Sequence, residues 1–253
     1  MIHKRFRFMI VFLMWTAHSW ISIKEAYCDP KLRAEVLTDV PISLGLGGLA
    51  EYQGQWRIAT SVGLMPRSYV ALSNAVVMQL PNTYTEPTAE LIEETIQNSV
   101  VWSMVAGWSP RSIGFYTHVG YRLVTLGGGA TAASLIEGIT GQMLGDDDAA
   151  SPDREPLMID AASTLHMLGL EIGWEWPVLR FKSEESLILR ASIGWSYTFR
   201  SSAVLDVDFA GRRPIAKEAL KQLGVAGEEY LVDTFDRYVH PPTVSLALGY
   251  QWN

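Results

Sequence analysis

The sequence predicts an all-β fold, an antiparallel transmembrane β-barrel of about eight strands with helical extracellular loops. Three observations lead to this fold class. Hydrophobic residues alternate with small or polar residues, with a period of two, in seven segments of the chain. Aromatic residues crowd the ends of the hydrophobic faces of these segments. Short and long connections alternate between the segments, as they do in outer-membrane barrels.

The first 28 residues have the features of an export signal. Three basic residues within the first seven positions are followed by an apolar stretch over residues 8–17. That stretch is shorter than the ~20 residues that a membrane-spanning helix needs, which disfavours an N-terminal anchor. Small residues at the −3 and −1 positions predict cleavage after Cys28, and cleavage after Ser19 is the alternative. We therefore divide the chain into a signal peptide, 1–28, and a barrel, 29–253.

Cys28 is the single cysteine of the chain. A mature protein that begins after it has no disulfide, thiol nucleophile or thiolate metal site. Acylation of Cys28, as in a lipoprotein, is the alternative, and it fits badly with the preceding Glu25 and Tyr27.

The charge of the chain excludes general nucleic-acid binding. The protein has 20 Lys and Arg against 27 Asp and Glu, and residues 1–28 hold four of the basic residues and one acidic residue. Residues 29–253 therefore carry a net charge of −10 (16 − 26), without a cluster of basic residues that could contact phosphates. Beyond the signal there is no apolar run of transmembrane-helix length, which excludes a helical inner-membrane protein.

The seven alternating segments are about 9–15 residues long, near the length that a tilted strand needs to cross a bilayer. In chain order they are 42–52, 56–64, 99–108, 114–123, 167–176, 187–200 and 243–252. In the sixth, for example, Leu189, Ile193 and Trp195 occupy one face and small or polar residues the other. Single-chain bacterial barrels have an even number of strands, so an eighth is needed. The alternation of Leu32, Ala34 and Val36 is a candidate for it.

The apolar faces predict contact with lipid, and their aromatic ends predict membrane girdles. Amphipathic rings favour the boundary between lipid and water. The predicted membrane girdle consists of Trp56, Trp102, Trp108, Trp174, Trp176 and Trp252. A soluble β-sandwich is the alternative, but its outer face would be polar.

The connections predict a barrel with tight turns at one end and helical loops at the other. Residues 53–55 and 109–112 form tight turns, whereas 67–98, 128–161 and 201–242 are long. Helix-forming spacing occurs within these long connections at 87–97, 131–144, 215–223 and 228–238. We interpret Gly127–Gly129 as the exit from a strand into a helical loop. The segment 69–80 is too apolar for a free surface loop, which predicts a cap over the barrel mouth.

The chain resembles small bacterial outer-membrane barrels, similar in scale to the OmpA and OmpX barrels. The resemblance depends on the export signal, the alternating strands and a terminal strand that runs from Thr243 to Asn253. It implies location in the outer membrane and recognition of the last strand by the barrel-insertion machinery. In such proteins the last strand ends in an aromatic residue; here Trp252 is followed by Asn253, which departs from the pattern.

The inward faces of the predicted strands carry charged residues that form the candidate site. They are Arg57, His118, Arg122, Glu171, Glu175, Arg190 and Arg200. In a narrow lumen these charges have to pair, because unpaired buried charge is costly. The prediction is an ion-pair network that plugs the barrel, with a narrow channel past Arg57, Arg122 and Arg190 as the alternative.

A barrel-embedded, lipid-modifying enzyme is the second alternative. It would need a histidine, a serine and an acid within hydrogen-bond reach. The nearest set, Asp160, Ser163 and His166, has a spacing that does not bring the three together on a strand. We therefore predict no catalytic residues. The acidic run at residues 146–148 lacks the spacing of a Ca²⁺ loop, so we predict no metal site and no cofactor.

The function that these patterns favour is a non-enzymatic outer-membrane protein with a structural or surface-interaction role. Its expected partners are outer-membrane lipid, the barrel-insertion machinery and a surface ligand at the loop cap.

Overall fold

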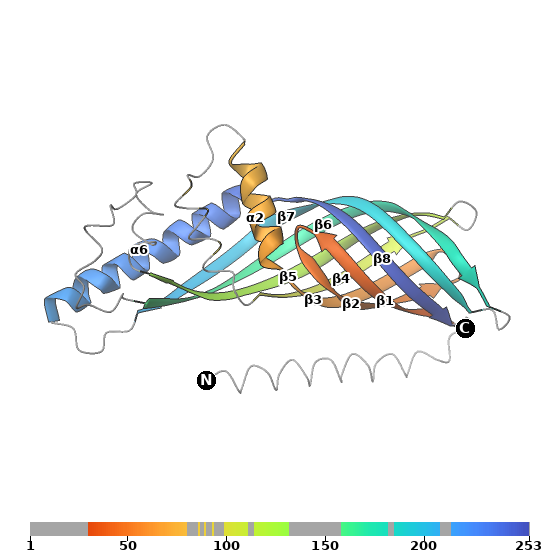
Figure 1. Cartoon of the computed structure of the whole chain (residues 1–253), viewed down its shortest axis with the longest axis horizontal. Helices are drawn as coiled ribbons and strands as arrows, with labels where there is room; N and C mark the ends of the chain where they lie inside the picture. The colour runs from red at the N-terminus through yellow and green to blue at the C-terminus, as the bar shows by residue number, and fades with distance from the viewer. Residues whose placement is uncertain are drawn as a thin grey trace.

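The computed structural model describes residues 30–79, 86, 89, 93, 99–110, 114–131, 158–181, 185–207 and 214–252. Within these residues, eight antiparallel strands close into a barrel in sequence order (Figure 1). The strands are β1 (Lys31–Val40), β2 (Ser43–Tyr52), β3 (Trp56–Leu64), β4 (Val100–Trp108), β5 (Phe115–Thr131), β6 (Met158–Arg180), β7 (Ser186–Val207) and β8 (Pro242–Trp252). The predicted fold class is confirmed. The predicted signal peptide lies outside the described residues.

The two ends of the barrel differ, and we name them by their connections. The turn rim carries residues 53–55, 109–110, Gly114, Phe181 and Glu185 together with the end of β8. At its tightest turn, Gln53 and Gly54 both have positive φ angles, 53° and 64°, as short hairpins between twisted strands require. The cap rim carries helices α2 (Arg67–Val77) and α6 (Pro214–Tyr238).

Strand β1 is the eighth strand, and it closes the barrel. Val36 pairs with Leu46 of β2 and with Leu248 of β8, which confirms the candidate strand around residues 32–36. Its even positions face outward, while Arg33 and Glu35 are buried in the lumen. The charged inward positions explain why β1 gives a weak hydrophobic pattern in the sequence.

Strands β5, β6 and β7 continue beyond the cap rim as a three-stranded extension (Figure 1). The last pair between β4 and β5 joins Val100 to Thr125, and β5 then continues to Thr131 against β6 alone. The interpretation of Gly127–Gly129 as an exit into a helical loop is therefore wrong. Residues 128–131, 158–161 and 201–207, predicted as loops, are also strand. Pairing with β6 supplies the backbone hydrogen bonds that offset the flexibility of these glycines.

Helix α6 merges two predicted helices into one. The sequence separates 215–223 from 228–238 because Gly224 and Gly227 lie between them. Both glycines are buried in the face of α6 that packs on β7. Packing against β7 thus overrides the low helix propensity of glycine.

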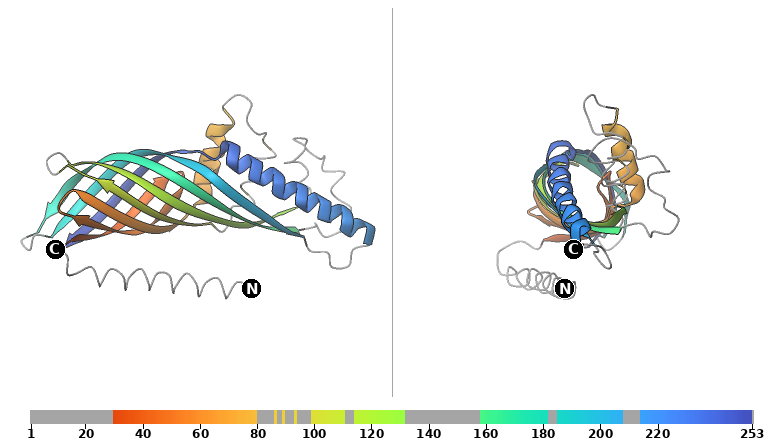
Figure 2. Two further views of the ribbon diagram at one scale, coloured as in Figure 1. Left: turned by 180° about the vertical axis from the view of Figure 1, so that it is seen from behind. Right: turned by 90° about the vertical axis from the view of Figure 1, so that its left-hand side faces the viewer.

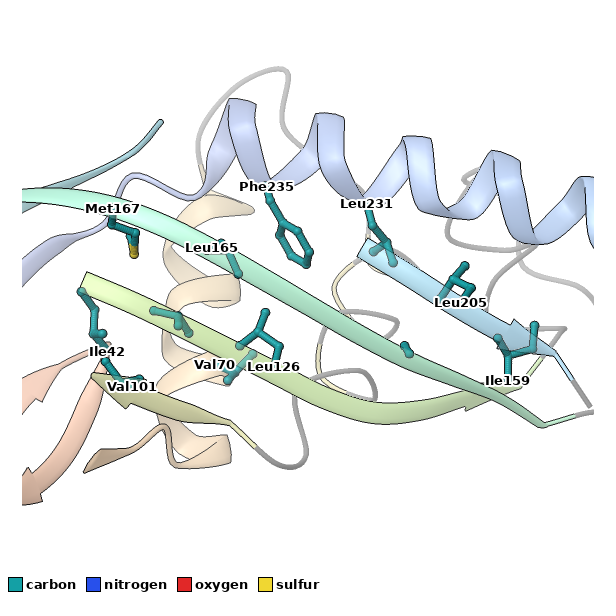
Figure 3. Packing of buried hydrophobic residues seen from close by; sticks show 12 residues of the cluster. Ile42, Val70, Val101, Leu126, Ile159, Leu165, Met167, Leu205, Leu231 and Phe235 are labelled. Atoms are coloured by element: carbon teal, nitrogen blue, oxygen red, sulfur yellow. The ribbon is translucent and has the colours of Figure 1, made fainter. Parts of the chain in front are cut away.

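The cap has a hydrophobic core of its own. Leu231 and Phe235 of α6 point toward Leu165 and Leu205 on the strands of the extension, and Val70 of α2 joins the same cluster (Figure 3). Viewed from the cap side, α6 lies in front of the barrel opening (Figure 2). The predicted helix at 87–97 lies almost wholly outside the described residues, and so does the one at 131–144.

Polar contacts also attach the cap to the strands, including a bond from the Ser201 hydroxyl to the Val232 carbonyl oxygen of α6 at 3.3 Å. The hydroxyls of Thr38 on β1 and Tyr69 on α2 lie 2.5 Å apart. The backbone N–H of Leu205 donates to Glu228 of α6 at 2.9 Å. Neither helix, nor any other helix in the described ranges, is long and apolar enough to cross a membrane.

We predict that Gly45→Ala lowers the free energy of unfolding by about 1–3 kcal/mol, because a new methyl group is forced into a packed wall. A Cβ at Gly45 would collide with the backbone of Val62 and Gly63 on β3. Gly48→Ala on the same strand is the matched control, since its Cβ would meet nothing closer than the Arg33 carbonyl oxygen at 3.8 Å. Urea unfolding in detergent micelles measures both; equal midpoints would contradict the prediction.

Candidate functional site

The outer wall of the barrel is a continuous apolar belt. Exposed outward positions alternate with more buried inward ones along the strands, and Leu46, for example, is 64% exposed. From 32–40 on β1 to 242–252 on β8, the outward positions between the rims of the described barrel carry no Asp, Glu, Lys or Arg. The eleven residues of β8 match the length that a tilted strand needs to cross the hydrocarbon. Such a surface is suited to lipid.

Aromatic rings border this belt at both ends. Five of the six predicted girdle tryptophans lie near the turn rim, where Trp56 pairs with Trp108 across β3 and β4. Trp174, Trp176 and Trp252 point outward at the same end and are also exposed. Trp102 lies toward the cap rim, with its ring 6.0 Å from that of Tyr121 in an edge-to-face arrangement.

The lumen is filled by charged side chains that pair across it in layers. Nearest the turn rim, Glu175 on β6 lies between two arginines. Arg57 on β3 is 2.6 Å from Glu175 and 2.8 Å from Glu51, and Arg33 on β1 is 3.0 Å from Glu175. Arg33 also donates to the side-chain oxygen of Gln251 at 3.0 Å. This layer therefore links β1, β2, β3, β6 and β8.

Tyr116 forms the centre of the next layer and is fully buried, with 0% of its surface exposed. Its ring lies between the guanidinium groups of Arg57 and Arg190, at 5.7 and 5.4 Å from the ring centroid. Its hydroxyl donates to Glu171 at 3.1 Å. Arg190 in turn is 2.9 Å from Glu35 of β1.

The third layer contains His118 and Arg122 of β5. Arg122 is 3.5 Å from Asp39 of β1 and donates to the Ser196 hydroxyl at 2.5 Å. His118 is buried, and its Nδ1 atom is 4.0 Å from Glu171. The enclosed cavity beside these residues measures about 10 Å³, which is the space of a single water molecule.

Six of the seven predicted lumen residues are brought together in these layers, and Arg200 is not. A bulge in β7 pairs His166 with Arg200 but Met167 with Thr198, which leaves Phe199 as an extra residue. The alternation reverses there, so Arg200 is exposed on the outer wall. The prediction that Arg200 faces the lumen is a consequence of extending the period of two through this bulge.

Sequence reasoning missed half of the network. The missed residues are Arg33, Glu35, Asp39, Glu51, Tyr116 and Gln251. Three of them, Arg33, Glu35 and Asp39, lie at odd positions of β1. They alternate with Leu32, Ala34 and Val36, and this alternation was the one sequence pattern that could have identified them. With them, the lumen within the described residues holds four arginines and five carboxylates, each with a partner of opposite charge or a hydrogen bond.

The serine, histidine and acid considered for catalysis do not converge. His166 faces outward and its Nδ1 atom lies 2.6 Å from the Tyr121 hydroxyl, whereas Ser163 is buried on the inward face. Asp160 is exposed in the extension. Within the described ranges no group of three or more His, Cys, Asp and Glu side chains could hold a metal ion. The acidic run at 146–148 lies outside those ranges.

A pocket of about 450 Å³ opens at the turn rim, between Lys31, Glu51, Arg57, Ser109 and Glu175. Its floor is the first ion-pair layer, so the opening ends where the plug begins.

A closed eight-stranded antiparallel barrel with an apolar outer belt and a filled lumen is the fold of the small bacterial outer-membrane barrels. Two crystal structures from Acinetobacter baumannii are similar to this chain. One is CarO2, with 12% identity and a TM-score of 0.36, covering 89% of this chain and 100% of the other. The second is CarO, with 12% identity and a TM-score of 0.36, covering 88% and 98%. No family model matches the sequence, and no curated protein matches it.

We predict that Glu175→Gln lowers the free energy of unfolding by about 3 kcal/mol, because it leaves Arg33 and Arg57 without their shared carboxylate. The 15% exposure of the Glu175 side chain keeps the expected cost at the lower end for buried pairs.

Asp233→Asn is the matched isosteric control, since Asp233 pairs with Arg237 on the surface of α6 with its side chain 63% exposed. Its effect is expected to stay below about 0.5 kcal/mol. Urea unfolding of folded barrels in micelles compares the two variants. Equal losses in the free energy of unfolding would show that the lumen ion pair stabilises the barrel no more than a surface pair does.

Proposed function

We propose that the protein is a non-enzymatic outer-membrane barrel that anchors a rigid, surface-exposed cap for contact with a ligand outside the cell. The observation that carries the proposal is the division of the chain into a plugged barrel and a packed extension. Strands β5, β6 and β7 run without interruption from the apolar belt into the cap, where α6 covers them.

The plugged lumen favours a structural role over a channel. A conducting pore would need a continuous wet path past Arg57, Arg122 and Arg190. Each of these guanidinium groups instead contacts a carboxylate within 3.5 Å. Above them, Val124 and Met167 are 2% exposed and Phe235 of the cap is 1% exposed, so apolar side chains fill the end of the barrel nearest the cap.

The packing of the cap favours an interaction surface that is held in one conformation. Leu231 and Phe235 are almost fully buried against the extension, so α6 is fixed along one face. The opposite face of α6 is exposed and carries Glu229, Asp233 and Asp236 together with Arg237. A charged helix face held rigidly above a membrane is suited to a charged or hydrogen-bonding ligand.

The arrangement offers less support for a lipid-modifying enzyme. Ser163 and His166 are on opposite faces of β6, so this serine does not lie beside the outward histidine in the manner that acyl transfer needs.

The first test is a heat-modifiability gel on membrane fractions of a Gram-negative host that expresses the full chain. We expect the protein in the outer-membrane fraction, with an unheated mobility that boiling abolishes, because closed barrels resist detergent until heated. Planar bilayers that contain the same folded sample are expected to show no stepwise conductance.

Soluble periplasmic protein without a mobility shift would contradict the membrane location. Sustained conductance steps from a folded sample would contradict the plug and favour the channel.

We also predict that Phe235→Ala loosens the cap and leaves the barrel closed. Removing a buried phenylalanine costs about 3–5 kcal/mol, because it leaves a cavity between α6 and the extension. Val225→Ala, on the same helix but 50% exposed, is the control. Limited proteolysis should cut α6 faster in Phe235→Ala alone, while the unheated mobility of both variants stays that of the wild type. Equal cleavage rates would show that α6 is not held by this contact.

A further inference from the structure

The bulge in β7 brings a cationic side chain to the outer wall at the cap-side border of the apolar belt. Without the extra residue Phe199, position 200 would keep the inward direction of Ser196 and Thr198. With it, Phe199 and Arg200 are both exposed, in succession. Arg200 is thus the first charged residue above the outward apolar positions of β7. Bulges that re-aim a side chain in this way are common next to functional positions.

Arg200 has an outward-facing partner on the neighbouring strand. His166 of β6 lies directly opposite it in the register, so the two side chains share one face of the sheet. The Nδ1 atom of His166 is held by the Tyr121 hydroxyl at 2.6 Å. The described part of the chain offers no partner to the Nε2 atom of His166 or to the guanidinium of Arg200. Both groups therefore have hydrogen-bonding capacity directed away from the protein.

Aromatic rings lie on the belt side of this pair. The ring of Phe199 is 6.1 Å from that of His166 and 6.4 Å from that of Tyr121, and Trp102 continues the group at 6.0 Å from Tyr121. Below them the outward positions are apolar down to the turn rim. From the turn rim toward the cap, the wall thus carries first apolar side chains, then aromatic rings, and then the guanidinium of Arg200 and the imidazole of His166.

We infer that Arg200 and His166 bind the phosphate group of a membrane lipid whose acyl chains lie on the belt below. A planar guanidinium can donate two parallel hydrogen bonds to phosphate oxygens. When Tyr121 donates to Nδ1, the Nε2 atom of His166 carries the proton and donates as well. The ligand is a lipid rather than a free anion, because the donors adjoin a continuous apolar wall that acyl chains can cover. This inference rests on the proposed membrane-spanning barrel.

The test is native mass spectrometry of the full chain, folded in octyl glucoside micelles and titrated with two lipids. One is phosphatidylglycerol, and the other is a galactosyl diacylglycerol with the same acyl chains and no phosphate. We expect the wild type to prefer phosphatidylglycerol, and Arg200→Gln to lower its affinity about fivefold, the usual effect of one basic residue at an anionic membrane surface. His166→Gln should reduce the same preference. Arg237→Gln, which removes an exposed arginine from α6, should not change it.

The unheated gel mobility of each sample separates the possible failures. A closed barrel that binds both lipids equally, or that keeps its preference in Arg200→Gln and His166→Gln, would overturn this inference and leave the proposed function intact. A wild type without a heat-sensitive compact form would overturn the proposed function instead. Inorganic phosphate that binds as tightly as phosphatidylglycerol would show that the site recognises a free anion and not a lipid. If Arg200→Gln does not fold, the His166→Gln comparison decides.

Discussion

The ion pairs of Glu175 with Arg57 and Arg33 are the contacts on which the barrel interior depends. They join β6 to β3 and β1 across the lumen, at distances of 2.6 and 3.0 Å. A small barrel has no hydrophobic core in this half, so its inward side chains must satisfy one another. The position of Arg57 also fixes the ring of Tyr116, and Tyr116 fixes Glu171, so each layer depends on the one nearer the turn rim.

The interior changes character toward the cap, and this change divides the molecule into two parts. The ion-paired layers end at Arg122 and Ser196, and beyond them the buried interior is mainly the apolar cluster of the cap, with Ser163, Thr198 and Thr234 as buried polar residues. In the first part, ion pairs fill the lumen and the outer wall is apolar, as contact with lipid requires. The second resembles the core of a soluble protein, with a helix packed on a twisted sheet. Continuous strands join the two parts, so the orientation of the cap is set by the barrel itself.

The sequence could predict the barrel because lipid and lumen impose opposite demands on neighbouring residues of a strand. The prediction was weakest in segments where apolar and polar residues do not alternate clearly. In β1 three of the inward residues are charged, Arg33, Glu35 and Asp39, so the strand resembles a loop in the sequence. In the extension, Gly127–Gly129 and Ala161 give no alternation, and pairing with the neighbouring strand decides the structure. The misplaced Arg200 has another cause, because a bulge shifts the register by one residue and leaves the flanking pattern intact. The sequence also could not predict which lumen residues pair, because Glu35 contacts Arg190 only once the sheet has closed into a barrel.

The placement of charge on β1 has a consequence for how the barrel is completed. Its three inward charges do not pair with the adjacent strands alone; Arg33, Glu35 and Asp39 reach across the lumen to β6, β7 and β5. A sheet from which β1 had come away would leave Arg122 and Arg190 without these carboxylates, in surroundings with little water. Seam opening between β1 and β8 is therefore coupled to the loss of three distant ion pairs. Strand β1 therefore detaches only with the loss of all three ion pairs. A barrel opened at this seam alone is disfavoured relative to both the closed barrel and the fully unfolded chain.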